Sequence, residues 1–220
     1  MTVLSVREAY RLWAPAYDRE TAVSALEAET VESLGVLAAG RALLDVGCGT
    51  GRRLRASGAS LAVGVDLSTE MLSVARGETV IAGDLRAIPA AAKTFDVVWC
   101  RLAIGHVREL AVAYAELARV CRPGGTVVVT DLSPDAAAAG HRRTFRDDTG
   151  ATYEVEHHVH TVDAHTSAAT TARLEMIARR DGVVGPGARR FYAEAGRLFA
   201  YDAQVGQPIV LALAWRKLAS

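Results

Sequence analysis

Three acidic residues, Asp45, Asp66 and Asp84, each follow directly after a short apolar run that is typical of a buried strand. Residues 47–51 carry glycine at every second position, which lets the backbone turn sharply and approach a ligand closely. Because the carboxyl ends of parallel strands meet at one edge of a sheet, the three carboxylates are expected to face one crevice. Carboxylates in that place suit hydroxyl groups and a cationic group, and they repel phosphate.

The glycine loop lacks the dinucleotide-binding fingerprint G-x-G-x-x-G. A match that starts at Gly47 would need glycine where the sequence has Arg52. Asp66, at the tip of the second strand, is nevertheless placed to accept hydrogen bonds from the two hydroxyls of a ribose. The pattern therefore predicts a ribose-containing ligand in a crevice that is not built for a pyrophosphate.

The elements that must position these residues alternate between strand and helix patterns. Apolar side chains at helical spacing between residues 6 and 37 predict two helices with a break near Pro15. The predicted later helices are Ser68–Arg76, Glu109–Val120 and Ser167–Arg180. The predicted strands are Ala42–Val46, Leu61–Val65, Thr79–Gly83, Phe95–Cys100, Thr126–Thr130 and Pro208–Trp215, with a hairpin formed by Arg143–Phe145 and Thr152–Val162.

Five segments, in order along the chain, resemble the class I S-adenosylmethionine-dependent methyltransferases. The chain is most similar to the group typified by ubiquinone and menaquinone biosynthesis methyltransferases, also called methyltransferase type 11. The resemblance covers roughly Arg41 to Asp131, and the segments are far more specific together than singly. They are Leu44–Gly51, Gly64–Leu72, Gly83–Leu85, Phe95–Val98 and Leu117–Gly125.

This resemblance implies an α/β, Rossmann-like class I methyltransferase fold. Its sheet would be seven-stranded and mostly parallel with the last strand antiparallel, preceded by N-terminal helices and carrying an inserted β-hairpin lid. Arg189–Tyr192 and Pro208–Trp215 would fit the last two strands. One methyltransferase domain would span residues 1–220, divided into an N-terminal helical cap (1–38), a cofactor-binding core (41–132), an inserted lid or substrate segment (133–166) and a C-terminal helix with final strands (167–220).

The resemblance also implies S-adenosyl-L-methionine as cofactor and S-adenosyl-L-homocysteine as product. Asp45 and the 47–51 backbone would face the methionine part, Asp66 the ribose, and Asp84 with Leu85 the adenine. The acids could instead simply cap strands and helices, and Tyr17 could be a packing aromatic. The predicted cofactor-binding residues are Tyr17, Asp45, Gly47, Cys48, Gly49, Gly51, Asp66, Leu67, Met71, Gly83, Asp84, Leu85 and Arg101.

All six histidines lie beyond the cofactor-binding strands. A histidine accepts a proton near neutral pH, so these residues are candidates for a base or an acceptor-orienting group. The alternative is that they are structural or surface groups on the hairpin. The candidates are His106, His141, His157 and His158.

Two other kinds of chemistry are open but disfavoured. In a continuous strand, His158 and His160 would share one face and could bind zinc with Glu156 or His165. No cysteine joins them, and polar strand faces are more often solvated, so no metal is expected. Cys100 could be a nucleophile, but a lone cysteine near a strand end is more often a small core residue.

The composition is that of an ordinary globular protein of 220 residues with a formal net charge of +0. It lacks the basic excess that indicates a nucleic-acid partner. Three cysteines with no close pair argue against a disulfide framework, and no run is long enough to span a bilayer. A cytoplasmic protein with a small-molecule partner is expected, either a monomer or a homodimer.

Taken with the resemblance, the sequence predicts methyl transfer by in-line displacement to an oxygen, nitrogen or carbon nucleophile of a small molecule. Methyltransferases that modify nucleic-acid bases carry characteristic motifs after the fourth strand. Residues 99–106, which complete and follow that strand here, lack those motifs. Two other functions stay open. An RNA-modifying enzyme would need a basic face from Arg142, Arg143, Arg146 and the pair Arg189-Arg190, and a non-catalytic protein would bind the cofactor without turnover.

Overall fold

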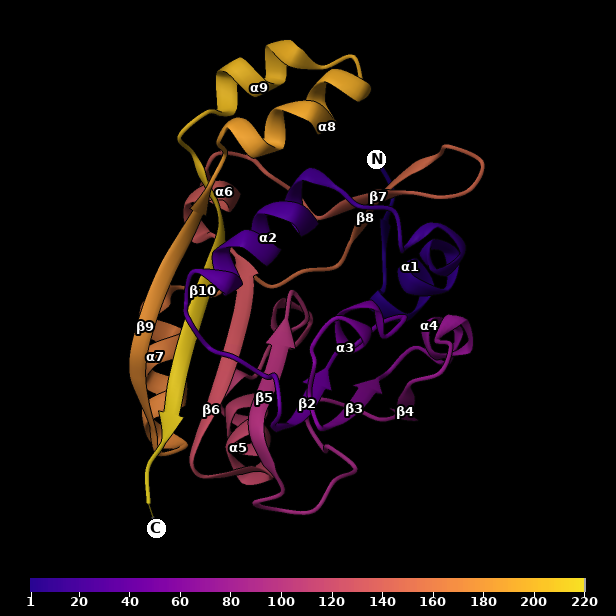
Figure 1. Cartoon of the computed structure of the whole chain (residues 1–220). Helices are drawn as coiled ribbons and strands as arrows, with labels where there is room; N and C mark the ends of the chain where they lie inside the picture. Colours follow the sequence, from indigo (N-terminus) through magenta and orange to yellow (C-terminus); the bar gives the residue numbers. More distant parts are fainter. Residues whose placement is uncertain (220) are drawn as a thin grey trace.

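A seven-stranded sheet forms the centre of the molecule in the computed structural model, which describes residues 1–219 (Figure 1). Its strand order is β4-β3-β2-β5-β6-β10-β9. Neighbours from β4 to β6 pair in parallel, whereas β10 runs antiparallel to both β6 and β9. The predicted α/β fold, with seven strands and an antiparallel last strand, is confirmed. The strands of this sheet are β2 (Ala42–Val46), β3 (Leu61–Asp66), β4 (Thr79–Ala82), β5 (Phe95–Arg101), β6 (Cys121–Leu132), β9 (Leu174–Val183) and β10 (Pro208–Lys217).

Helices cover both faces of the sheet because successive strand side chains point to opposite faces. Leu44 belongs to the core beneath α5 and α7, which includes Tyr114. Its neighbour Leu43 belongs to the core beneath α2 and α3, which includes Leu54. Both leucines are fully buried. Residues 42–46 therefore form a strand that is covered on both faces, as predicted. The helices are α1 (Val6–Trp13), α2 (Ala22–Glu32), α3 (Arg52–Arg55), α4 (Thr69–Val74), α5 (Leu110–Val120), α6 (Pro134–Ala138), α7 (Val162–Thr171), α8 (Arg189–Glu194) and α9 (Leu198–Gln204), with short 3₁₀ turns at Ala14–Ala16, Ile104–His106 and Pro186–Ala188.

A second, three-stranded sheet lies beside α1. Its strands are β1 (Val3–Leu4), β7 (Thr144–Arg146) and β8 (Thr152–Val155), in the order β1-β8-β7. The hairpin of β7 and β8 was predicted. β1 was not, because a strand of two residues is too short to show the alternation of apolar and polar side chains. β1 pairs in parallel with β8, so the start of the chain is attached to the insert.

The predicted second strand of the hairpin is too long. β8 ends at Val155 instead of continuing to Val162. The backbone N–H of His158 donates to the carbonyl of Gly105 at 2.7 Å, so residues 156–161 follow the loop after β5 rather than a strand partner. The period-two face predicted to hold His158 and His160 therefore does not form.

The prediction for the C-terminal part is wrong in two places. The predicted helix Ser167–Arg180 corresponds to α7, which follows the N-cap residue Thr161. It begins earlier than predicted, at Val162, and ends earlier, at Thr171. Arg173 has a φ of 60°, and the chain then forms β9 by pairing with β10. Arg189–Tyr192, predicted as a strand, lies within helix α8, which packs with α9 beyond the end of the sheet (Figure 1). In residues 174–180, the pairing of β9 with β10 outweighs the local helix propensity.

Smaller boundary differences have local causes. α4 ends at Val74 rather than Arg76, because Ala75 is extended and Gly77 has a φ of 81°. β6 begins at Cys121, five residues before the predicted start at Thr126, through pairing of Cys121 with Phe95. None of the helices between residues 1 and 219 has the length and apolar character that a membrane crossing requires.

Candidate active site

A cavity of about 330 Å³ opens at the carboxyl ends of β2, β3, β4 and β5. This is the edge at which the sequence predicted a crevice. Part of its lining comes from the strand tips and Tyr17. The remaining lining residues, here together called the acceptor end, are Ser5, Val6, Arg7, Tyr10, Leu102, Ala103, His106, Val107 and Glu156.

The glycine loop after β2 is fitted closely to its surroundings. Gly47 has a φ of 78°, and a Cβ there would lie 2.4 Å from the Cβ of Ala103. Gly49 has a φ of 58°, and a Cβ on it would lie 3.1 Å from the ring of Tyr17. Only glycine suits both the backbone conformation and the space. Both residues line the cavity.

Asp66 is fixed at the tip of β3 by two backbone donors. Gly49 N–H donates to Oδ2 at 2.7 Å and Ser68 N–H donates to Oδ1 at 2.8 Å. Burial raises the pKa of Asp66, while these N–H groups oppose that change. Ser68 also caps α4. The carboxylate is therefore oriented before any ligand arrives.

Asp84 and Leu85 line the same part of the cavity. The carboxylate of Asp84 forms an ion pair with Arg86, whose Nη2 lies 2.6 Å from Oδ2. The hydrogen bonds from Arg86 lower the pKa of Asp84. Arg86 also lines the cavity and was not foreseen in the site. Leu67 and Gly83 complete this part.

Four of the predicted cofactor residues do not line the cavity. Gly51 is the left-handed N-cap of α3, and Met71 is buried in α4. Cys48 packs against the β3 backbone, since a Cβ on Gly64 would lie 2.6 Å from its sulfur. Asp45 is fully buried, and neither carboxylate oxygen has a hydrogen-bond partner among residues 1–219. Burial raises the pKa of Asp45 to about 6, against the opposing charges of Arg53 and Arg101.

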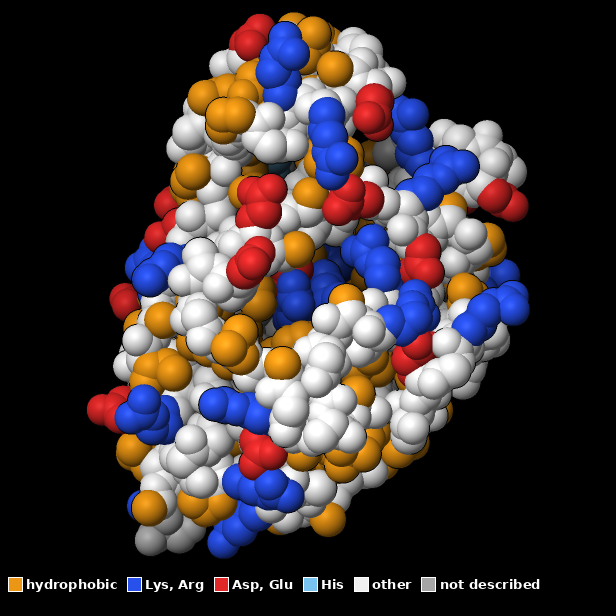
Figure 2. Space-filling view, in the orientation of Figure 1, with side chains coloured by type: hydrophobic (Ala, Val, Ile, Leu, Met, Phe, Trp, Pro, Cys, Tyr) orange, Lys and Arg blue, Asp and Glu red, His pale blue; other side chains and the backbone are white. Residues whose placement is uncertain are grey.

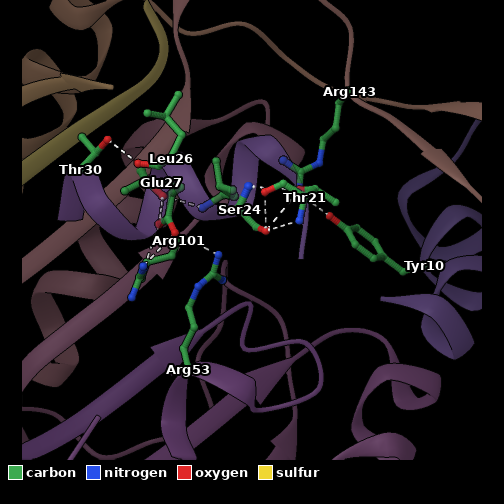
Figure 3. A network of polar contacts seen from close by, with 11 residues as sticks. Tyr10, Thr21, Ser24, Leu26, Glu27, Thr30, Arg53, Arg101 and Arg143 are labelled. Carbon is green, nitrogen blue, oxygen red and sulfur yellow. Dashed lines mark hydrogen bonds and ion pairs between the residues drawn. The ribbon is translucent and has the colours of Figure 1, made fainter. Parts of the chain in front are cut away.

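Arg101 lines the cavity. Its guanidinium forms an ion pair with Glu27, an acid that the sequence analysis missed. Its Nε and Nη2 atoms each donate at 2.8 Å to the carboxylate of Glu27, which is fully buried in α2 (Figure 3). Arg53 and Thr130 also donate to Glu27, at 3.1 and 2.9 Å. Glu27 lies on the buried face of α2 with Leu26, Thr30 and Val31, so the signal in the sequence was an acid beside the helix-spaced apolar residues Leu26 and Val31. A capping box of Thr21 and Ser24 fixes where this helix begins, and so sets the position of Glu27 along it.

This cluster lowers the pKa of Glu27 to about 2. Burial alone would raise the pKa, but the charges of Arg53 and Arg101 outweigh it. Glu27 therefore stays ionised and orients Arg101 at the floor of the cavity.

His106 is the one candidate histidine that lines the cavity. Its Nδ1 lies 3.1 Å from the carbonyl oxygen of Glu156, and its Nε2 lies 2.8 Å from the hydroxyl of Tyr10. Burial, with the charge of Arg143, lowers the pKa of His106 to about 3. The ring is therefore neutral, and because a carbonyl only accepts, the proton is on Nδ1. Nε2 then accepts from the Tyr10 hydroxyl.

His157 lies behind His106, with ring centroids 5.9 Å apart, and does not line the cavity. Its Nε2 lies 3.1 Å from Oδ1 of the buried Asp131, and His165 lies 3.5 Å from Oδ2 of the same carboxylate. These two contacts outweigh burial and hold the pKa of Asp131 well below its usual range. The group supports the acceptor end from inside the protein.

The other two candidate histidines lie elsewhere. His141 approaches Gln207 at 3.4 Å, and His158 stands beside His160 at 6.4 Å between ring centroids. Neither lines the cavity. The part of the chain that the structure describes holds no group of three or more His, Cys, Asp or Glu side chains placed for a metal. The zinc arrangement considered for His158 and His160 is therefore not formed.

Cys100 is fully buried, and burial raises the pKa of its thiol well above the usual value. It does not line the cavity, so these facts favour a core role over a nucleophile. Arg190, named for a basic face, pairs with Glu20 at 2.7 Å. Figure 2 shows basic and acidic side chains interspersed over the face drawn, rather than a continuous basic surface.

The fold and this cavity define a class I methyltransferase architecture, with a glycine loop and a strand-tip acid at the carboxyl edge of the sheet. Residues 44–129 match the family described as a methyltransferase domain. Residues 44–129 thus resemble a methyltransferase domain, and the fold of the chain is that of S-adenosylmethionine-dependent methyltransferases.

Curated relatives agree with this assignment. The chain is 32% identical over 139 residues to the malonyl-[acyl-carrier protein] O-methyltransferase of Erwinia billingiae, a match that covers 60% of this chain and 55% of the relative. It is 34% identical over 168 residues to the protein of the same name from Dechloromonas aromatica, covering 73% of this chain and 60% of the relative. The chain thus spans little more than half the length of the curated relatives it matches.

Solved structures show the same fold. An S-adenosylmethionine-dependent methyltransferase from Mesorhizobium loti superposes with a TM-score of 0.67 at 21% identity, covering 89% of this chain and 100% of that one. A [4+2]-cyclase superposes with a TM-score of 0.67 at 20% identity, covering 98% and 96%. The geranyl diphosphate C-methyltransferase of Streptomyces coelicolor, solved with S-adenosyl-L-homocysteine, gives 0.61 at 16% identity, covering 89% and 79%. The fold is therefore shared by proteins with different acceptors and reactions.

The residues present fit S-adenosylmethionine, the cofactor of this family. The glycine loop leaves a cradle that a Cβ at Gly47 or Gly49 would fill. The Asp66 carboxylate stands beside it, already oriented for hydroxyl donors. Tyr17 closes over the loop at Gly49.

Proposed function

We propose that the protein transfers the methyl group of S-adenosylmethionine to an oxygen nucleophile of a small or carrier-bound acceptor. The single observation that supports this most is the continuity of the cavity, which joins the cradle at Gly47 and Asp66 to the acceptor end at Tyr10 and His106. The names of the curated relatives support oxygen as the atom that receives the methyl group.

The residues at the cradle would bind and orient the cofactor. Asp66 would accept hydrogen bonds from the ribose hydroxyls, and Leu67 and Leu85 would flank the adenine. Asp84 would act beside Arg86 rather than alone, since the two are already paired. Asp45, Cys48, Gly51 and Met71 would act indirectly, by shaping the loop and α4.

When bound, the cofactor supplies an electrophilic methyl group on a positively charged sulfur. The protein must then hold the acceptor in line, exclude water and, where the acceptor carries a proton, remove it. Tyr17, the hairpin and α1 would cover the cavity. Among the candidate histidines, His106 would orient the acceptor, whereas His157 would support His106.

The test is a methyl-transfer assay with labelled S-adenosylmethionine and oxygen acceptors, together with calorimetric titration of S-adenosylhomocysteine. His106→Ala should lower turnover by roughly 10²-fold and leave cofactor affinity nearly unchanged, while His141→Ala should leave both unchanged. Absence of cofactor binding would overturn the proposal. Binding without turnover for any acceptor would favour the non-catalytic function.

A further inference from the structure

We propose that Asp18 is a positioning residue, which holds Tyr17 over the glycine loop and thereby slows the departure of bound cofactor. This inference rests on the proposed function, because it concerns how long S-adenosylmethionine or its product stays in the cradle. Asp18 is not among the residues that line the cavity, whereas its neighbour Tyr17 is. Asp18 would therefore act only through Tyr17.

The segment that carries Tyr17 has little support from its own backbone. It lies between a 3₁₀ turn and the start of α2. The N–H of Tyr17 donates to the carbonyl of Ala14 at 3.4 Å. The N–H of Arg19 donates to the carbonyl of Ala16 at 3.3 Å. Both bonds are longer than the roughly 2.7–3.2 Å of most such hydrogen bonds, so the position of Tyr17 depends largely on side-chain contacts.

The carboxylate of Asp18 connects this segment to the glycine loop. The hydroxyl of Thr50 donates a hydrogen bond to Oδ1 of Asp18, and Nη2 of Arg55 lies 3.6 Å from Oδ2. In addition, Arg52 donates to the backbone carbonyl of Asp18 at 3.3 Å. Three contacts from the loop and from α3, the helix that follows it, therefore meet at Asp18.

The hydrogen bond from Thr50 should contribute most of the three. The side chains of Asp18 and Arg55 are 45% and 40% exposed, and an exposed ion pair of this kind contributes little. Thr50, in contrast, is 1% exposed. A buried hydroxyl that loses its partner is costly, and a charged acceptor makes the bond stronger. The pair of Thr50 and Asp18 is thus the main link between the segment and the loop.

This link fixes the ring of Tyr17 relative to the cradle. Thr50 belongs to the cradle itself, since it follows Gly49 directly. A Cβ on Gly49 would lie 3.1 Å from the ring of Tyr17, and that ring also packs against Trp13 of α1, with ring centroids 4.9 Å apart. Tyr17 therefore contacts both the loop and α1 while its neighbour Asp18 is bonded to Thr50.

A ligand in the cradle would be covered by Tyr17, which lines the cavity beside Gly49. For the ring to move away from the loop, the hydrogen bond between Thr50 and Asp18 has to break. Loss of this bond should therefore speed the dissociation of the ligand. It should also loosen the segment when no ligand is present.

The experiment measures the dissociation rate of S-adenosylhomocysteine from the 220-residue chain by surface plasmon resonance. Asp18→Ala should raise this rate roughly tenfold, the effect of losing one charge-assisted hydrogen bond. Thr50→Val should raise it to a similar degree, because it removes the same bond from the other side. Asp18→Asn keeps an acceptor oxygen for the Thr50 hydroxyl and should remain close to the wild type.

A double variant tests whether Asp18 acts through Tyr17. Tyr17→Ala alone should release the ligand faster than the wild type does. Adding Asp18→Ala to Tyr17→Ala should then change the rate by less than about twofold, because the ring that Asp18 positions is already gone. The same roughly tenfold increase in both backgrounds would assign Asp18 a merely structural role and overturn the inference.

Hydrogen exchange of the ligand-free protein gives an independent readout. The amides of residues 16–20 should exchange faster in Asp18→Ala than in the wild type. Glu20→Ala is the matched control, because Glu20 is an acid of the same segment whose exposed ion pair is with Arg190 on α8, at 2.7 Å. It should keep the exchange and the dissociation rate of the wild type.

The inference is overturned by a wild-type dissociation rate in Asp18→Ala, by an equal increase in Glu20→Ala, or by unchanged exchange of residues 16–20 in Asp18→Ala. Each of these outcomes leaves the proposed function standing. Failure of the wild type to bind S-adenosylhomocysteine would instead overturn the proposed function, and this inference with it, so the two failures are distinguishable.

Discussion

The backbone N–H of Gly49 donates a hydrogen bond of 2.7 Å to the carboxylate of Asp66, so the loop after β2 is fastened to the tip of β3. Two motifs that are separate in the sequence thereby become one cradle. The bond orients one carboxylate oxygen of Asp66, and the N–H of Ser68 orients the other.

Asp66→Ala should weaken the binding of S-adenosylmethionine and S-adenosylhomocysteine by about 2 kcal/mol, roughly 30-fold, because charge-assisted hydrogen bonds to two hydroxyls are lost. Calorimetric titration measures this. Asp202→Ala, an exposed acid on α9, serves as the control and should bind normally. An affinity that is the same in Asp66→Ala and in the wild type would remove Asp66 from the site.

Asp45 gives a prediction that separates stability from function. Its pKa is raised by burial to about 6 in the folded protein, against about 4 when unfolded. The folded state therefore binds the extra proton between these values, and stability falls as pH rises from about 4 to about 6. In Asp45→Asn this fall should be smaller by about 3 kcal/mol, as measured by urea unfolding across that range.

The same variant should bind the cofactor more weakly, if the buried charge of Asp45 helps to hold the cationic methionine part. If Asp45→Asn showed the same pH dependence of unfolding as the wild type, the pKa of Asp45 would not be raised in the folded protein. An unchanged cofactor affinity would assign Asp45 to the structure alone.

Glu27 has the opposite pH dependence. Its pKa is lowered from 4.5 to about 2, so the stability it contributes is present above about 4.5 and is lost as pH falls towards 2. Glu27→Gln should destabilise the protein at pH 7 by about 3 kcal/mol, because Arg53 and Arg101 lose their shared carboxylate. Its stability should also depend less on pH below 4.5. Glu175→Gln, on the exposed part of β9, should match the wild type in both respects, and similar unfolding curves for the two variants would contradict the prediction.

Gly105 allows the contact between His157 and Asp131. A Cβ on Gly105 would lie 2.1 Å from Nε2 of His157 and 2.7 Å from Oδ1 of Asp131. Gly105→Ala should therefore separate this pair and destabilise the protein by about 2 kcal/mol in urea unfolding. Gly185→Ala is the control, because a Cβ there meets only the carbonyl of Val183, at 3.8 Å. Equal stability of the two variants would show that the acceptor end repacks freely.

The sequence predicts best the parts of the site that are built locally. The cradle is formed by a strand, a glycine loop and a second strand within Ala42–Asp66, so its residues could be placed from pattern alone. Tyr17, Arg101 and His106 were also placed at the cavity. Asp45 was assigned a direct contact by resemblance to the family, but β2 is covered on both faces and Asp45 is fully buried.

What the sequence could not predict depends on contacts between distant segments. Tyr10 and Arg143 are brought together by the packing of α1 against the hairpin, and no local periodicity marks either of them. β9 carries a helix-compatible sequence, and its partner β10 decides its conformation. In the same way, Glu27 belongs to the site because α2 packs against β9 and β10, which brings its carboxylate to Arg101 on β5 and Thr130 on β6.

The pairing of β1 with β8 joins residues 3–4 to residues 154–155. The N–H of Glu154 donates to the carbonyl of Thr2, and that of Glu156 to the carbonyl of Leu4. Two residues of strand give this junction little independent stability, whereas the central sheet is covered on both faces. Amide protons of β1 and β8 should consequently exchange with solvent sooner than those of β2 and β5. If this exchange pattern is observed, the wall beside the cavity would be a cooperative unit separate from the central sheet, and its opening would let ligands enter and leave while that sheet stays folded.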